Sequence, residues 1–250
     1  MSFDQVAEHY DETRGGEARG DAYAAEIDGL LPRGDRAVLE IGVGTGVVAI
    51  GLRRRGRAVV GIDVSAPMLA RARARLGSCL IRCDGAALAI ATASMDHAVS
   101  VWVLQSVADP VAVLAEVARA LRPGGRCVVS NAQIADPTDE IGQVIEKMGR
   151  EVHRRRGASR PHKISADQVL GWGAQAGFDP GEVHRRRHTW TSSPAAELRA
   201  IEYRTWPALR ALDEAAFAEV TAPVMRRLRA LPPDDVVRRG VAETVVLLRP

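Results

Sequence analysis

Short apolar runs alternate with longer amphipathic stretches between residues 37 and 131. The runs are nearly continuous in valine, isoleucine and alanine, as expected for parallel strands covered on both faces. The stretches between them place apolar residues at helical spacing. This alternation predicts an α/β protein with a doubly wound sheet. The predicted strands are AVLEI (37–41), AVVGI (58–62), CLIR (79–82), DHAVSV (96–101) and RCVVSN (126–131), and the predicted helices are 47–55, 66–76 and 109–125.

The regular alternation stops after residue 131. Helical spacing dominates the next stretch and is interrupted by a loop rich in glycine, serine and proline. Ser165 and Gln168 form a capping-box pattern, which predicts the start of one helix. The predicted helices here are 140–156, 165–177, 194–205 and 213–230, and the predicted strands are 181–190 and 243–250.

The composition limits the function classes. A chain of 250 residues can form one large α/β domain or two small ones. The formal charge is +3, from 34 basic and 31 acidic residues, which is too small an excess to indicate a nucleic-acid surface. The 3 cysteines lack the spacing of a zinc site, so we expect no metal and buried, reduced thiols. The polar N-terminus and the absence of a long apolar run predict no signal peptide, no membrane contact and a cytoplasmic location.

A predicted strand runs directly into a glycine-rich turn in VLEIGVGTG, residues 38–46. A dinucleotide fingerprint needs a small residue at the third position of G-x-G-x-x-G, where this chain has Val47. A phosphate-binding P-loop needs a lysine, and none lies near the turn. A phosphate cradle is therefore disfavoured. The turn can instead let a ligand lie against bare backbone, or it can be a tight connection without a ligand.

Two aspartates follow the next two predicted strands. Asp63 lies about 20 residues after Gly42, the offset at which an acid meets ribose hydroxyls. Its alternative role is a helix cap, for which Ser65 is better placed. Asp84 could accept a hydrogen bond from an adenine amino group, or it could simply begin a loop. Because all three features fall at the same edge of the predicted sheet, they are more specific together than singly.

Together these motifs resemble the class I S-adenosylmethionine (SAM)-dependent methyltransferases, in the small-molecule branch that includes quinone-biosynthesis enzymes. VLEIGVGTG, GIDVSAPMLARAR and CDGAALAI with Asp96 are similar to their first three motifs, and FDQVAEHYDETR to their N-terminal segment. The resemblance implies a Rossmann-like sheet of seven strands, mostly parallel, with the last strand antiparallel beside the fifth. It also implies one SAM-binding domain over 1–250, a helical N-terminal segment over 1–30, and cap or substrate-pocket insertions at 132–164 and 191–232.

The resemblance further implies which residues hold SAM and its product S-adenosylhomocysteine. Where relatives often carry a His-His pair, this chain has Gln105 and Ser106. The residues implied are Tyr10 and Arg14 near the methyl and carboxylate groups, Glu40, Gly42, Gly44 and Gly46 at the methionine portion, Asp63 at the ribose, Val64, Met68, Asp84 and Gly85 around the adenine, and Val101 and Trp102 at the ammonium group.

The resemblance implies transfer of the SAM methyl group to an O, N or C atom of a small molecule by in-line displacement. His153 and His162 are the candidate general bases, and the alternative is that no histidine is essential. The arginine-rich run between them indicates either an anionic substrate or a solvated helix end. An alternative function is a protein of this fold that binds SAM without methylating, or serves as a partner subunit. The sequence determines neither the acceptor nor the oligomeric state.

Overall fold

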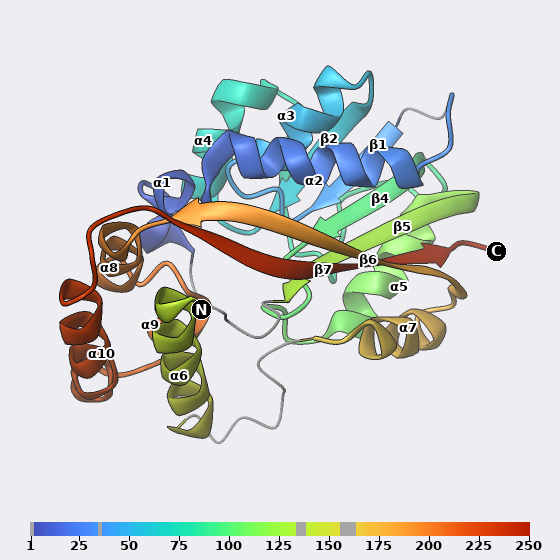
Figure 1. Cartoon of the computed structure of the whole chain (residues 1–250). Helices are drawn as coiled ribbons and strands as arrows, with labels where there is room; N and C mark the ends of the chain where they lie inside the picture. Colours follow the sequence, from blue (N-terminus) through green and yellow to red (C-terminus); the bar gives the residue numbers. More distant parts are fainter. Residues whose placement is uncertain (1–2, 35–36, 134–138, 156–163) are drawn as a thin grey trace. The chain divides into compact units, whose positions relative to one another are not determined.

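The computed structural model describes residues 3–34, 37–133, 139–155 and 164–250 (Figure 1). The chain divides into two compact units, which are described separately. The larger unit comprises residues 2–131, 164–184 and 243–250, and the smaller unit comprises residues 132–163 and 185–242.

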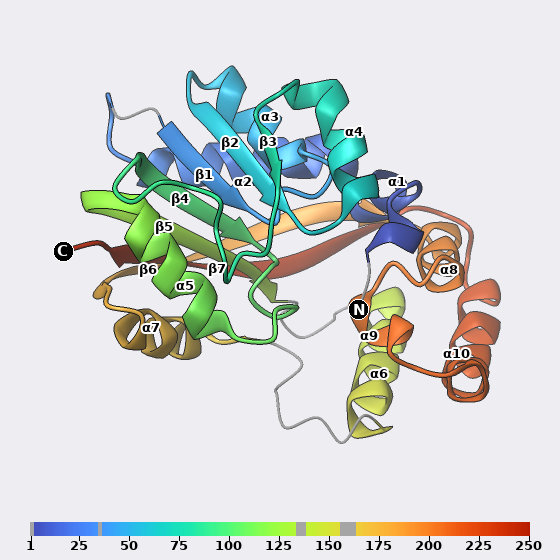
Figure 2. The same cartoon turned by 180° about the vertical axis from the view of Figure 1, so that it is seen from behind.

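The described residues form a sheet with the strand order β3-β2-β1-β4-β5-β7-β6. Strands β1 to β5 pair in parallel, and β7 is the antiparallel strand beside β5 (Figures 1 and 2). The fold class and the place of the last strand are therefore as predicted. The strands are β1 Ala37–Ile41, β2 Ala58–Asp63, β3 Leu80–Arg82, β4 Met95–Val101, β5 Leu121–Gln133, β6 Asp179–Ser192 and β7 Val236–Leu248.

Helices cover both faces of the sheet in the larger unit (Figures 1 and 2). One face carries α2 (Gly16–Leu30), α3 (Val47–Arg54) and α4 (Ala66–Leu76). The other carries α5 (Pro110–Ala120) and α7 (Ala166–Gln175). The strands are apolar on both sides for this reason. The core beneath α5 and α7 includes Leu39, Ile62, Val129, Val113, Leu114 and Val169, all buried.

Side-chain caps begin several of these helices where the sequence predicts them. The Ser65 hydroxyl accepts a hydrogen bond from the Met68 N–H at 3.3 Å. Ser165 and Gln168 form the predicted capping box at the start of α7. These bonds satisfy N–H groups that have no partner within the helix, so the polar residue fixes where each helix starts.

Two expectations need correction. The helix predicted over 109–125 ends at Ala120, and β5 begins at the next residue because Leu121 pairs with Met95 of β4. The Pro-Gly-Gly sequence therefore lies in the strand, where the Gly124 N–H donates to the Arg249 carbonyl at 2.8 Å. The expected burial of the thiols is correct for Cys127, which is buried in β5. Of the two cysteines that flank β3, Cys79 is exposed and Cys83 is half-buried.

The smaller unit is mainly helical. Its helices α6 (Glu140–Arg155), α8 (Pro194–Glu202), α9 (Pro207–Arg210) and α10 (Glu214–Arg229) share an apolar core. Members of this core include Ile141, Met148, Ile201, Leu209 and Leu228. The role of these segments as a cap stays a prediction. Within the described ranges, no helix has both the length and the apolar character needed to cross a bilayer.

Candidate functional site

The glycine turn after β1 is a stretch of bare backbone. Gly42, Gly44 and Gly46 have φ of 64°, 55° and 82°, a region that other residues rarely adopt. A Cβ on Gly42 would lie 2.5 Å from Val103 Cγ2, so a larger residue has no room there. The turn is anchored to β2 because the Val43 N–H donates to the Ile62 carbonyl at 2.8 Å.

Asp63, the last residue of β2, holds this turn in place. Its Oδ2 accepts a hydrogen bond from the Gly44 N–H at 2.9 Å, and its Oδ1 accepts one from the Ser65 N–H at 2.9 Å. Burial raises the pKa of Asp63, against the opposing effect of these hydrogen bonds. A carboxylate has about four acceptor positions, so Asp63 keeps capacity for a ligand hydroxyl. The sequence indicated the acid but not its bond to the turn.

Glu40 is buried in β1 beside this turn, with 3% of its surface exposed. Its Oε2 has no hydrogen-bond partner among the described residues. Burial, with a smaller contribution from the charge of Asp63, raises the pKa of Glu40 to about 8. An unsatisfied buried carboxyl group carries a desolvation penalty that a cationic ligand group would reduce. The site thus offers a place for an ammonium group.

The segments that follow β2 and β3 differ in exposure. Val64 leaves 56% of its surface exposed, which is unusual for a large apolar residue. Met68, in contrast, is 2% exposed and packs in a cluster with Val6 and Ala7. Asp84 is exposed, and its Oδ1 accepts the Ala86 N–H at 2.9 Å.

Gly85 lies close to the end of β1. A Cβ on Gly85 would be 3.5 Å from Ile41 Cγ2 and 3.3 Å from Val113 Cγ1. The loop after β3 therefore runs beside the strand that carries the glycine turn. This neighbourhood is the one expected when successive parallel strands end at a common edge.

Trp102 follows β4 in a conformation rare for a bulky residue, with φ of 58°. The backbone N–H of Trp102 donates to the Ser130 carbonyl at 3.0 Å, and the backbone carbonyl of Trp102 accepts from Gln105 Nε2 at 2.7 Å. The ring of Tyr23 meets the indole edge to face, with the centroids 4.7 Å apart. The Arg19 guanidinium carbon lies 3.8 Å from the indole centroid. Several contacts thus maintain this strained residue, a pattern that is common at functional sites.

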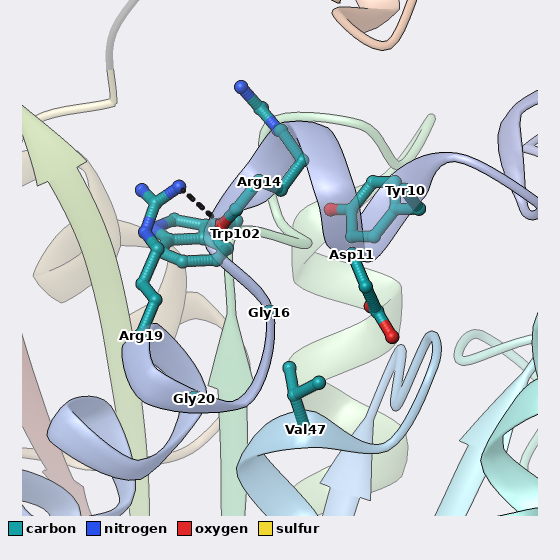
Figure 3. Close-up of a pocket in the computed structure, with 8 residues that line it drawn as sticks. All are labelled: Tyr10, Asp11, Arg14, Gly16, Arg19, Gly20, Val47 and Trp102. Atoms are coloured by element: carbon teal, nitrogen blue, oxygen red, sulfur yellow. Dashed lines mark hydrogen bonds between the residues drawn. The ribbon is translucent and has the colours of Figure 1, made fainter. Parts of the chain in front are cut away.

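A pocket lies beside Trp102 (Figure 3). The sequence predicted three of its lining residues, Tyr10, Arg14 and Trp102. It assigned no ligand contact to the others: Asp11 and Val47 lie in or beside motifs, and the remaining residues belong to none. The full lining consists of Tyr10, Asp11, Arg14, Gly16, Arg19, Gly20, Val47 and Trp102.

The N-terminal segment, with the short helix α1 (Tyr10–Arg14), is bonded to the glycine turn. Asp11 Oδ1 accepts from the Thr45 hydroxyl at 2.5 Å, and its Oδ2 accepts from Arg75 Nη2 at 2.9 Å. Arg75 also donates to the Thr45 carbonyl at 2.9 Å. The segment predicted from sequence to border the cofactor thus contacts the turn through a charged network.

The two candidate bases belong to another part of the chain. His153 lies half-buried in α6 of the smaller unit, and His162 falls outside the described residues. In the larger unit, His97 is buried and its Nδ1 accepts from the Arg126 N–H at 3.2 Å, so it supports the sheet. Across the residues that the structure covers, no cluster of histidine, cysteine and acidic side chains has the makings of a metal site.

Comparisons with known proteins agree with this geometry. Residues 39–129 match the family model described as a methyltransferase domain. An uncharacterized methyltransferase of Geobacillus kaustophilus is 33% identical over 198 residues, which cover 75% of this chain and 92% of the relative. Demethylmenaquinone methyltransferase of Mycobacterium sp. (strain KMS) is 32% identical, over 70% of this chain and 79% of the relative.

Other relatives match over a shorter span. An uncharacterized methyltransferase of Mycobacterium bovis is 33% identical over 110 residues, 43% of this chain, so the chain spans 56% of that relative's length. Among solved structures, Haemonchus contortus phosphoethanolamine N-methyltransferase 2, in complex with phosphomonomethylethanolamine and S-adenosylhomocysteine, is similar with a TM-score of 0.56. That match has 18% identity and covers 99% of this chain and 58% of the other, so it shows the fold alone.

The relatives that match over most of their length carry the identification, and the turn, Asp63 and the seven-stranded sheet are consistent with it. The chain therefore belongs to the family of SAM-dependent methyltransferases.

Proposed function

We propose that this protein transfers the methyl group of SAM to an O, N or C atom of a small molecule. The observation that carries the proposal is the glycine turn tied to Asp63 at 2.9 Å, with the buried, unsatisfied Glu40 carboxyl beside it. Such a site suits a ligand that combines an amino acid with a nucleoside, because it offers bare backbone, an acid for an ammonium group and an acid for a ribose.

The residues present fit SAM part by part. Glu40 would face the ammonium group, with backbone near Val101 and Trp102, and Arg14 would face the carboxylate. Asp63 would accept hydrogen bonds from the ribose hydroxyls. The exposed Val64 side chain offers an apolar face to the adenine. Met68, Asp84 and Gly85 would complete the adenine surroundings, and Tyr10 would lie near the methyl group.

Bound SAM supplies an electrophilic methyl group on a sulfonium. The task of the chain is then to hold an acceptor atom in line with the carbon–sulfur bond and to exclude water. Positioning of this kind can remove on the order of 7–11 kcal/mol from a barrier. Tyr10 and Trp102, which line one pocket, are the side chains we assign to this task on the cofactor side.

The small-molecule acceptor is supported by charge and by the relatives. A formal charge of +3 over 250 residues gives little basis for binding a nucleic acid. The mycobacterial relative named as a demethylmenaquinone methyltransferase acts on a small molecule by its name. Quinols and phenols are therefore the first acceptors to test, followed by amines.

The test has two stages. S-adenosylhomocysteine at 100 times its dissociation constant should stabilise the protein by about 2.7 kcal/mol, whereas NAD should not. Methyl-labelled SAM is then incubated with a panel of quinols, phenols and amines, and label in an acceptor is measured. Tight binding of S-adenosylhomocysteine without transfer to any acceptor would favour a non-methylating role, and stabilisation by NAD alone would exclude the proposal.

The need for a general base is a separate question. A base typically contributes 10²–10⁴-fold, and it is needed mainly when the nucleophile is a neutral hydroxyl or a carbon acid. We expect the double variant His153→Ala/His162→Ala to keep turnover within roughly tenfold of the original, because an ionised phenol or an amine needs no base. A loss of about 10²-fold or more, with SAM affinity unchanged, would assign the base to this pair.

A further inference from the structure

Two consecutive glycines bring two arginines to one pocket. Helix α1 ends at Arg14, and the chain turns through Gly15 and Gly16, whose φ values are 84° and 50°. Helix α2 begins there and carries Arg19 one turn later. Both arginines line the pocket beside Trp102, as Figure 3 shows.

Close packing keeps α2 against the start of α3. A Cβ on Gly20 would lie only 2.5 Å from the Val47 carbonyl oxygen. Arg19, the neighbour of Gly20, is therefore held beside the first turn of α3. The N-cap of α3 is Gly46, which provides no side-chain acceptor for the first N–H groups of the helix. These groups give the pocket a positive potential, which favours an anion.

The arginines in this pocket have no carboxylate facing them among its lining residues. Asp11 is the acidic member of the lining, and its carboxylate is directed to Thr45 and Arg75, which each bond one of its oxygens. Arg14 Nε is buried without a hydrogen-bond partner among the described residues. Arg19 Nη1 donates to the backbone carbonyl of Arg14 at 3.3 Å, and both residues line the pocket.

The environment of Arg19 is costly for a cation. Burial, followed by the nearby charge of Arg14, lowers the pKa of Arg19. The indole face of Trp102, 3.8 Å from the guanidinium carbon, recovers part of this cost and fixes the plane of the guanidinium. An anion between the two arginines would offset the remainder, and a carboxylate matches the planar donor fork.

We propose that Arg19, stacked on Trp102, binds the carboxylate of the cofactor together with Arg14. This inference rests on the proposed function, because it assigns a residue to the methionine end of the same site. Trp102 acts as a positioning residue, since it sets the orientation of Arg19. The resemblance to known methyltransferases assigns no role to Arg19.

The test compares two ligands that differ in one group. S-adenosylhomocysteine carries the carboxylate, and S-adenosyl-3-thiopropylamine keeps the nucleoside, sulfur and amine but lacks it. We expect Arg19→Gln to lower the affinity for S-adenosylhomocysteine by roughly tenfold to one hundredfold, which is typical for the loss of a hydrogen bond to a charged group. The affinity for the thiopropylamine should stay within about twofold. Arg19→Lys should recover part of the loss, because it keeps the charge but not the fork.

Controls separate this role from a structural one. Arg54→Gln removes the same group from an exposed position on α3 and should change neither affinity. Equal weakening of both ligands by Arg19→Gln would overturn the proposal in favour of a structural role. An unchanged affinity for both ligands, with a raised KM for the acceptor, would assign the pocket to the acceptor instead. Failure of the original protein to bind S-adenosylhomocysteine would overturn the proposed function itself.

Discussion

The carboxylate of Asp63, at the end of β2, accepts a hydrogen bond from the backbone N–H of Gly44 at 2.9 Å. Gly44 lies in the turn that follows β1, so one side chain joins the ends of two neighbouring strands. The second oxygen bonds the Ser65 N–H at the start of α4. Asp63 therefore shapes the turn before any ligand arrives, which adds a structural role to the ribose contact proposed for it.

Asp63→Ala should consequently weaken the binding of S-adenosylhomocysteine and lower the unfolding temperature. Each lost hydrogen bond to a charged group corresponds to about 1.5–3 kcal/mol. Calorimetric titration and thermal unfolding measure the two effects. Asp109→Ala is the matched control, because Asp109 also accepts backbone N–H bonds at a helix start, that of α5. It should cost stability alone, and an equal loss of affinity in both variants would contradict the role of Asp63.

Glu40 should make stability depend on pH. Its pKa is about 8 in the folded protein and 4.5 in the unfolded chain, so between these values the folded state holds a proton that the unfolded state has lost. The free energy of unfolding must then fall as pH rises across this window, by up to about 1.4 kcal/mol per unit from this group. Glu40→Gln should flatten the decline seen in denaturant unfolding between pH 5 and pH 8, and an unchanged slope would show that Glu40 ionises normally.

Gly20→Ala should destabilise the protein, because its Cβ would lie 2.5 Å from the Val47 carbonyl oxygen and force α2 away from α3. Overpacking of this kind typically costs about 1–3 kcal/mol. Gly29→Ala, in the same helix, is the control, because no atom lies within 4 Å of its Cβ position. That change should be neutral or stabilise by up to about 1 kcal/mol. Urea unfolding measures both, and similar results for the two variants would refute the packing argument.

Arg238→Ala should destabilise the smaller unit. Arg238 is 3% exposed, its Nη1 donates to Glu197 Oε1 at 3.0 Å, and its Nε lies 3.5 Å from Asp139 Oδ1. Removal of the arginine leaves the buried Glu197 and the half-buried Asp139 without their cationic partner, although each keeps one hydrogen bond, from Ser192 and from the Gly142 N–H. Breaking a buried ion pair from one side typically costs about 3–5 kcal/mol. Arg239→Ala, one residue along at an exposed position, should change the free energy of unfolding by less than about 0.5 kcal/mol. Chemical unfolding compares the two variants, and equal losses of stability would show that the ion pairs of Arg238 do not stabilise the protein.

The accuracy of the sequence-based prediction varied with the kind of signal. Strand β1 and helix α4 have the predicted bounds, because an apolar run or a capped amphipathic pattern is a local property of the chain. Helix α5 ends at Ala120 and not at the predicted residue 125, since Leu121 leaves the helix to pair with Met95 of a neighbouring strand. Strand β7 begins at Val236, before the predicted 243, and its added first part is more polar.

By itself, the sequence determined the α/β class, the glycine turn and the acids at the ends of β2 and β3, because spacing along the chain encodes each of them. The tertiary structure alone decided that Asp63 bonds Gly44, that Glu40 is buried without a full set of partners, and that Arg19 stacks on Trp102. These relationships join residues far apart in the chain. They depend on how closely elements pack and on the loss of water around charged groups, and neither quantity is written in the order of the residues.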